Sequence, residues 1–230
     1  MSGPSSDEGV ARRLAAVLLD MDGTLVDTEP HWIACEQELV AAHGGSWTDE
    51  DAMALVGKPL LVSAGYLSAV GGVDLAPAAI VERLLDGVVA RVRERIPWTP
   101  GAQELLSSLG AAGVPIALVT MSYRRLAEAV LDGVPDGTFG AVVTGDEVRE
   151  SKPHPEPYLR AAALLGVDPR RCVAVEDSPT GVASAEAAGC ITLAVDGVVA
   201  VPSAPGHINV RSLRDLTVDG LEQLVRPGPA

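Results

Sequence analysis

The chain has 230 residues, of which 47% are hydrophobic but only three are Trp, three Tyr and one Phe, so aliphatic side chains must fill most of its core. This length exceeds that of an ordinary single domain and predicts one large domain, or a core with a smaller insert. The formal net charge of −14 excludes a broadly basic surface and therefore argues against a nucleic-acid partner.

The first 13 residues are rich in Ser, Gly and charged side chains and contain no apolar run after a basic start. We interpret residues 1–13 as a disordered leader and not as a signal peptide. The apolar run 14–19 is only as long as a strand, and no run reaches the length of a membrane span. The three cysteines lie far apart in the sequence, which is typical of a reducing compartment. We therefore expect a cytoplasmic protein with no membrane partner.

Short apolar runs that end in polar or Gly-rich turns predict buried strands at 14–19, 114–119, 140–143, 172–175 and 191–195. Stretches with helical periodicity lie between them, at 101–110, 124–131, 155–165 and 181–188. Strand and helix thus alternate, and this predicts an α/β fold, a Rossmann-like parallel sheet with helices on both faces. Ligands of such sheets bind beyond the carboxyl ends of the strands.

Residues 30–97 do not follow this alternation, because their apolar positions recur at helical spacing and no strand run is present. We expect an inserted α-helical cap domain at 30–97 and a catalytic core formed by 14–29 and 98–230. Proline-bearing stretches at 27–30 and 97–101 are the expected hinges.

The acidic pair Asp20 and Asp22 follows the first predicted strand directly. A carboxylate at a strand end can attack a phosphoryl group, and a second one can protonate the leaving oxygen and then activate water. Repulsion between these groups and the phosphate calls for a divalent cation, and Mg²⁺ suits such ligands. The alternative is a plain turn, since Asp-Gly is a common turn dipeptide.

Polar residues also follow the later strands. Thr120 ends the second strand, where a hydroxyl can hold a phosphate oxygen or merely cap a helix. Lys152 lies beside two prolines and can neutralise carboxylate and phosphate, although most lysines are simply solvated. Glu176 and Asp177 end the fourth strand, where two adjacent acids are costly unless they are paired or bind a cation. Because these groups share one edge of one sheet, we predict a single active site.

In this order and spacing, the residues resemble the four motifs of the haloacid dehalogenase superfamily of phosphohydrolases: Asp20-Met21-Asp22-Gly23-Thr24, Thr120, Lys152-Pro153 and Glu176-Asp177-Ser178-x-x-Gly181. The resemblance implies that Asp20 is the nucleophile and Asp22 the acid and base. It implies a magnesium site formed by Asp20, the backbone carbonyl of Asp22 and Asp177, assisted by Glu176. Thr120 and Lys152 would contact the phosphoryl group, together with the backbone N–H at Met121.

The chain is most similar to the β-phosphoglucomutase-like phosphatases of this superfamily, which carry a helical cap after the first motif. We predict hydrolysis of a small phosphomonoester, such as a sugar phosphate, through an aspartyl-phosphate. The alternatives are a sugar-phosphate mutase and a non-enzymatic phosphate-accepting module. Mutases of this group have a histidine at the position of Trp32, and here the histidine is its neighbour His31. We expect a monomer, with a dimer as the alternative. The candidates for substrate contacts in the cap are Glu29, His31, Trp32, Lys58 and Arg91.

Overall fold

The computed structural model describes residues 14–225, so the predicted leader and residues 226–230 lie outside the described residues. A six-stranded sheet forms its centre, and each pair of neighbouring strands is parallel, in the order β3-β2-β1-β4-β5-β6. The strands are β1 (Ala16–Leu19), β2 (Ile116–Val119), β3 (Ala141–Val143), β4 (Cys172–Glu176), β5 (Ile191–Val195) and β6 (His207–Val210). The predicted α/β fold is confirmed. The edge strand β6 escaped prediction because two of its four residues are exposed and its sequence is not an apolar run.

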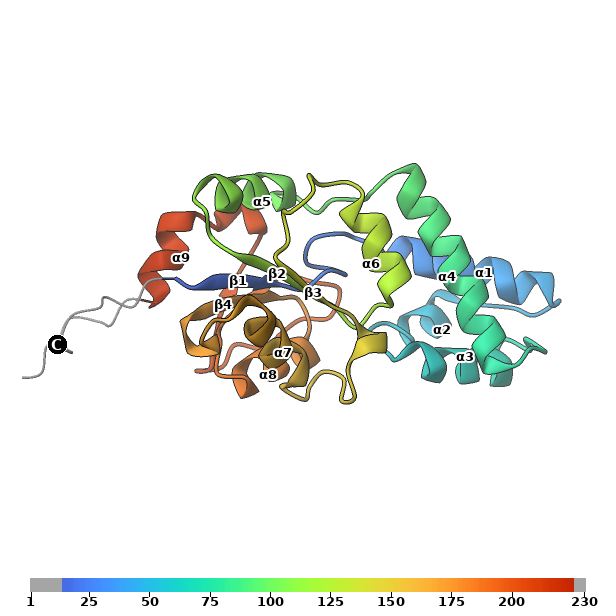
Figure 1. Ribbon diagram of the computed structural model, residues 1–230. Helices are drawn as coiled ribbons and strands as arrows, with labels where there is room; N and C mark the ends of the chain where they lie inside the picture. Colours follow the sequence, from blue (N-terminus) through green and yellow to red (C-terminus); the bar gives the residue numbers. More distant parts are fainter. Residues whose placement is uncertain (1–13, 226–230) are drawn as a thin grey trace, which may run out of the picture.

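Helices cover both faces of the sheet (Figure 1). Side chains of β1 alternate between them, so that Val17 and Leu19 pack on one side and Ala16 and Leu18 on the other. On the first face lie α5 (Ala102–Ala111) and α9 (Val218–Val225), and on the second lie α7 (Glu156–Leu165) and α8 (Pro179–Ala187). Three short 3₁₀ turns complete this part: η1 (Gly145–Glu147), η2 (Pro169–Arg171) and η3 (Leu213–Asp215).

The face covered by α7 and α8 is built largely from small side chains. Alanines of β1, β2 and β4 meet alanines of both helices, which lets the helices approach the sheet closely. Tyr158 of α7 is the aromatic side chain of this layer, and it is fully buried. This close approach brings α7 within reach of the polar residues at the carboxyl edge of the sheet.

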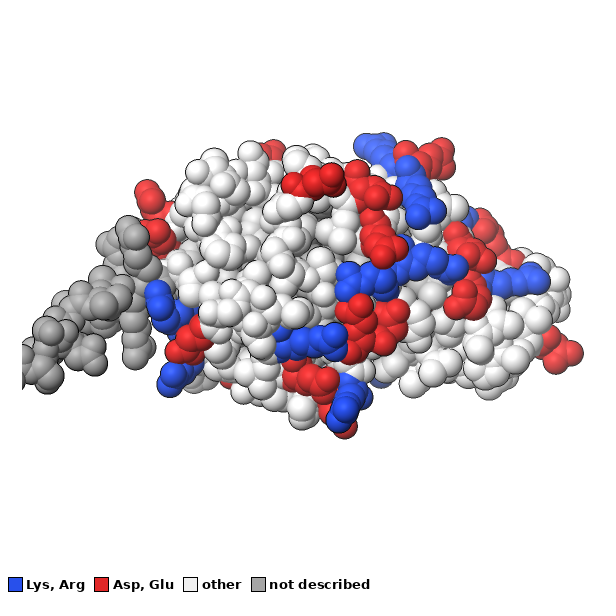
Figure 2. Space-filling model, viewed as in Figure 1, with Lys and Arg blue, Asp and Glu red and all other residues white. Residues whose placement is uncertain are grey.

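Four of the helices between β1 and β2 lie in the segment where helical spacing was predicted: α1 (Glu29–Ala42), α2 (Asp49–Met53), α3 (Leu60–Ala69) and α4 (Pro77–Glu94). The helix α6 (Arg124–Leu131) packs against α4. Arg125 of α6 pairs with Glu82 and Asp86 of α4 at 3.4 and 3.0 Å. Positive and negative side chains accordingly alternate over this region of the surface (Figure 2).

The chain passes between the sheet and these helices twice, and the two passages run side by side. The Asp27 N–H donates to the Pro97 carbonyl at 2.8 Å, and the Thr99 N–H donates to the Leu25 carbonyl at 3.0 Å. Val26 also forms an antiparallel bridge with Trp98. Within residues 14–225, no helix has the length and apolar character needed to cross a membrane.

Candidate active site

The predicted site residues meet at the carboxyl edge of the sheet. Asp20 follows β1, Thr120 follows β2, and Glu176 is the last residue of β4. The register pairs Leu19 of β1 with β2 and with β4, so these three strands end at the same level. Lys152 lies in the connection between η1 and α7, and its side chain reaches the same edge of the sheet.

Lys152 occupies the centre of the site and has a side chain only 5% exposed. Its ammonium donates to Asp20 Oδ1 at 2.7 Å, to Glu176 Oε1 at 2.5 Å and to the Val119 carbonyl at 2.8 Å. These three bonds use every donor of the ammonium group. Burial alone lowers the pKa of Lys152, but the carboxylates of Asp20 and Glu176 outweigh it and raise this pKa, so the group stays charged.

Glu176 is fully buried, and both of its carboxylate oxygens accept hydrogen bonds. Besides Lys152, Oε1 accepts the hydroxyl of Tyr158 at 2.7 Å, and Oε2 accepts the hydroxyl of Ser178 at 3.1 Å. Gly181 packs against the carboxylate so closely that a Cβ atom there would lie 1.9 Å from Oε2. The glycine at the end of the fourth motif therefore makes room for the Glu176 side chain.

Asp20, Glu176 and Asp177 form an acidic cluster whose nearest oxygens all lie within 4.8 Å of one another, close enough to share a metal ion. Burial, followed by the nearby charge of Glu176, raises the pKa of Asp20 well above its usual range. The same two causes raise the pKa of Asp177 to about 7. Three acidic side chains thus lie close to one ammonium, and their mutual repulsion makes it costly to ionise all three together.

Asp22 is not part of this cluster, and its carboxylate accepts hydrogen bonds from three hydroxyl groups. Thr28 donates to Oδ1 at 2.6 Å, while Thr120 and Ser122 donate to Oδ2 at 3.1 and 2.8 Å. Ser122 was not among the predicted site residues. Its position two residues after Thr120 repeats the spacing of Asp20 and Asp22, and that repeat is the signal in the sequence.

Met121 lies between these two hydroxyl residues and is half-buried. Its sulfur accepts the backbone N–H of Lys152 at 3.4 Å, so the side chain supports the loop that carries the lysine. Gly145 of η1 packs against the Met121 backbone, where a Cβ atom would lie 2.1 Å from the carbonyl oxygen.

Comparison with known proteins identifies the family. Residues 14–189 match the family described as haloacid dehalogenase-like hydrolase. The chain belongs to this family. It is 36% identical over 215 residues to hexitol phosphatase A of Escherichia coli (strain K12), a match that covers 92% of this chain and 94% of that protein.

Solved structures of this family share the fold. The structure of a CbbY mutant from Rhodobacter sphaeroides in complex with xylulose-(1,5)-bisphosphate has a TM-score of 0.81 and 28% identity, covering 91% of this chain and 99% of that one. β-Phosphoglucomutase from Clostridium difficile has a TM-score of 0.77 at 19% identity, covering 92% and 97%. The predicted resemblance to this superfamily and to its β-phosphoglucomutase-like members is confirmed.

The cap candidates of this haloacid dehalogenase-like hydrolase are spread over several environments. Glu29 begins α1, where burial and then the charges of Asp22 and Asp27 raise its pKa to about 7, so it lies within electrostatic reach of the site. Lys58 is exposed on the turn between α2 and α3. Trp32 packs on the hydrophobic core.

The other two candidates line a cleft of about 750 Å³ beside the two linkers. His31 and Arg91 face it together with Arg95, Trp98 and others, and none of the acidic cluster lines it. Arg91 already pairs with Glu38 at 2.5 Å.

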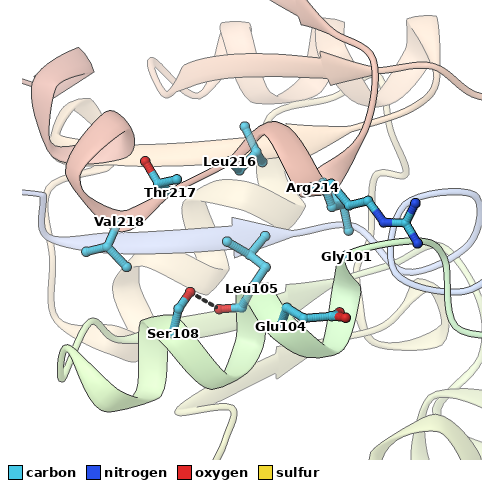
Figure 3. Close-up of a pocket in the computed structure, with 9 residues that line it drawn as sticks. Gly101, Glu104, Leu105, Ser108, Arg214, Leu216, Thr217 and Val218 are labelled. Carbon is cyan, nitrogen blue, oxygen red and sulfur yellow. Dashed lines mark hydrogen bonds between the residues drawn. The ribbon is translucent and has the colours of Figure 1, made fainter.

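A smaller cleft of about 340 Å³ lies between α5 and the η3–α9 segment, remote from the motif residues. Leu105, Leu216 and Val218 give it an apolar lining (Figure 3). The hydroxyl of Ser108 is turned back to the Leu105 carbonyl at 2.9 Å. This cleft offers one cation, Arg214, and none of the residues predicted for catalysis.

Proposed function

We propose that this protein is a magnesium-dependent phosphatase that removes the phosphoryl group from a small phosphorylated sugar or sugar alcohol. The observation that carries the proposal is the Lys152 ammonium, bonded to Asp20 and Glu176 beside an Asp22 carboxylate that three hydroxyls hold. A buried cation next to a nucleophilic carboxylate stabilises negative charge that develops on a transferring phosphoryl group. The similarity to a hexitol phosphatase supports the same activity.

In the proposed first step, the Asp20 carboxylate forms a bond to phosphorus and the bond from phosphorus to the sugar oxygen breaks. Asp22 must enter this step protonated; it gives its proton to that oxygen, which leaves as the alcohol, and regains a proton from water in the second step. In the second step, Asp22 takes a proton from water as the water oxygen attacks phosphorus. The bond to Asp20 then breaks, which regenerates its carboxylate and releases inorganic phosphate. In both steps Thr120 and Ser122 orient Asp22 through the hydrogen bonds that their hydroxyls donate to it.

The acidic cluster fits the magnesium ion that this chemistry needs. Its donors are all oxygens, which Mg²⁺ prefers, and a cation would relieve the mutual repulsion of its acidic side chains. We propose Asp20, Asp177 and the Asp22 backbone carbonyl as the protein ligands; a bound ion would neutralise charge on the phosphate and on the attacking carboxylate. Glu176 has its carboxylate bonded to Lys152, Tyr158 and Ser178. We therefore assign Glu176 mainly to the support of Lys152.

The helices α1 to α4 supply the proposed cap over the site. Thr28 stands immediately before α1 and binds Asp22, so movement of α1 relative to the sheet would lengthen this bond and free the Asp22 carboxylate for proton transfer. Glu29 is the first candidate for a contact with a sugar hydroxyl, because it lies near Asp22. A carboxyl group with a pKa of about 7 can both accept and donate such a hydrogen bond.

Release of inorganic phosphate from a panel of sugar, pentulose and hexitol phosphates, with and without Mg²⁺, tests the proposal. We expect release from at least one of these substrates, dependence on Mg²⁺, and no turnover by Asp20→Asn. Substantial activity of Asp20→Asn, or activity unaffected by a chelator, would refute the mechanism. Isomerisation of a hexose 1-phosphate in the presence of an activating bisphosphate would favour the mutase alternative instead.

A further inference from the structure

Tyr158 lies on the face of the sheet covered by α7 and contacts two residues of the motifs, Glu176 and Lys152. Its hydroxyl donates to Glu176 Oε1 at 2.7 Å, and the whole side chain is buried. A hydrogen bond from a neutral hydroxyl to an ionised carboxylate is stronger than one between neutral groups. This bond therefore has a large influence on the position of Glu176.

The geometry around Glu176 Oε1 explains what the hydroxyl adds. Lys152 and Tyr158 both donate to this one oxygen, while Ser178 donates to the other. With Gly181 packed on the carboxylate, the group is restrained on several sides. Without the hydroxyl, Oε1 would keep Lys152 as its one remaining donor and would lose the hydrogen bond that fixes this oxygen independently of the lysine.

The aromatic ring makes a second link to the same lysine. The Lys152 ammonium lies 5.2 Å from the centroid of the Tyr158 ring, within the range of a cation–π interaction. Tyr158 thus acts on both members of the Lys152–Glu176 pair. A phenylalanine would fill the same space and keep the ring contact, so the hydroxyl can be tested by itself.

We propose that Tyr158 is a positioning residue, which orients Glu176 through its hydroxyl and thereby keeps the Lys152 ammonium directed at Asp20. This inference rests on the proposed function, in which Lys152 stabilises the phosphoryl group. The Tyr158 side chain is linked to Glu176 by its hydrogen bond and to Lys152 by its ring, so we infer that its effect on turnover passes through these two residues.

The lysine content of the chain allows a direct test, since Lys58 and Lys152 are its only lysines. In protein labelled with ¹⁵N-lysine, the buried ammonium of Lys152 should exchange its protons slowly and give a signal that Lys152→Met removes. We expect Tyr158→Phe to speed this exchange about tenfold and to lower kcat by about ten- to a hundredfold with little change in KM. The matched control is Tyr66→Phe, which removes a 3.3 Å hydrogen bond to Asp51 far from the site and should change neither quantity.

Each result decides the inference. An unchanged Lys152 signal in Tyr158→Phe would overturn it, even if turnover fell, because the loss would then be a general effect of packing. If the variant does not fold, the nuclear Overhauser contact between the Lys152 ammonium and the Tyr158 ring in the unmodified protein tests the same arrangement, and its absence overturns the inference. A wild-type protein that lacks phosphatase activity but keeps this contact would refute the proposed function alone.

Discussion

Replacement of Lys152 by methionine is the most informative single perturbation of the site. Methionine keeps the unbranched shape of the side chain and removes only the charge, so the packing around it should survive. The change leaves Asp20, Glu176 and the Val119 carbonyl without the donor that now serves all three. Removal of one partner from a buried ion pair costs about 3–5 kcal/mol. We expect the free energy of unfolding of the metal-free protein to fall by about this amount at pH 8.

Turnover should fall as well, by about 10²–10³-fold, the usual effect of deleting one preorganised group that stabilises transition-state charge. Urea titrations without Mg²⁺ measure the stability, and steady-state assays with saturating Mg²⁺ measure kcat. Lys58→Met is the control for stability, because Lys58 is exposed and such substitutions change the free energy of unfolding by less than about 0.5 kcal/mol. If Lys152→Met matched Lys58→Met in stability, or kept kcat within threefold of wild type, Lys152 would not be the central cation of the site.

Two further substitutions test burial and packing. Burial raises the pKa of Glu36 in α1 from 4.5 to about 7. The neutral carboxyl group therefore contributes stability that is fully present below about pH 4.5 and is lost as the pH rises through 7. Glu36→Gln should therefore increase the free energy of unfolding at pH 8 by about 1–3 kcal/mol and leave it unchanged at pH 4.5; equal effects at both pH values would contradict this. Gly181→Ala places a Cβ atom against the Glu176 carboxylate and should lower kcat about tenfold or more, whereas Gly110→Ala, which meets no atom within 4 Å, should leave kcat as it is.

The parts of this molecule that the sequence predicts best are those that follow from one repeated pattern, an apolar run that ends in a polar residue. The runs before Asp20, Thr120 and Glu176 are strands buried on both faces, and such strands need nearly every side chain to be apolar. A polar residue can then occur only where a strand ends. Because the strands are parallel, these ends share one edge, and the site follows from the pattern.

Other parts could not be predicted because their signal lies in three-dimensional packing. Tyr158 belongs to the apolar face of α7 by its spacing, and only the approach of that helix to β4 brings its hydroxyl to Glu176. The helix α3 exposes Leu61 and Val62, so its apolar residues do not define one buried face. Strand β6 and helix α9 lie at the margins of the fold, where half-exposed segments obey the apolar patterns only weakly.

The choice of lysine at position 152 also follows from the geometry of its acceptors. Fifteen of the 17 basic residues are arginines, yet the centre of the site holds one of the two lysines. An ammonium is a compact point charge whose three donors diverge, and here they reach three acceptors at the ends of three strands, Asp20, Val119 and Glu176. A guanidinium is planar and suited to two oxygens of one carboxylate. It is also larger than an ammonium, and the space around Lys152 is small, because this side chain is only 5% exposed and lies against the Tyr158 ring. The convergence of three strand ends therefore requires an ammonium group, and an arginine at this position would not replace it.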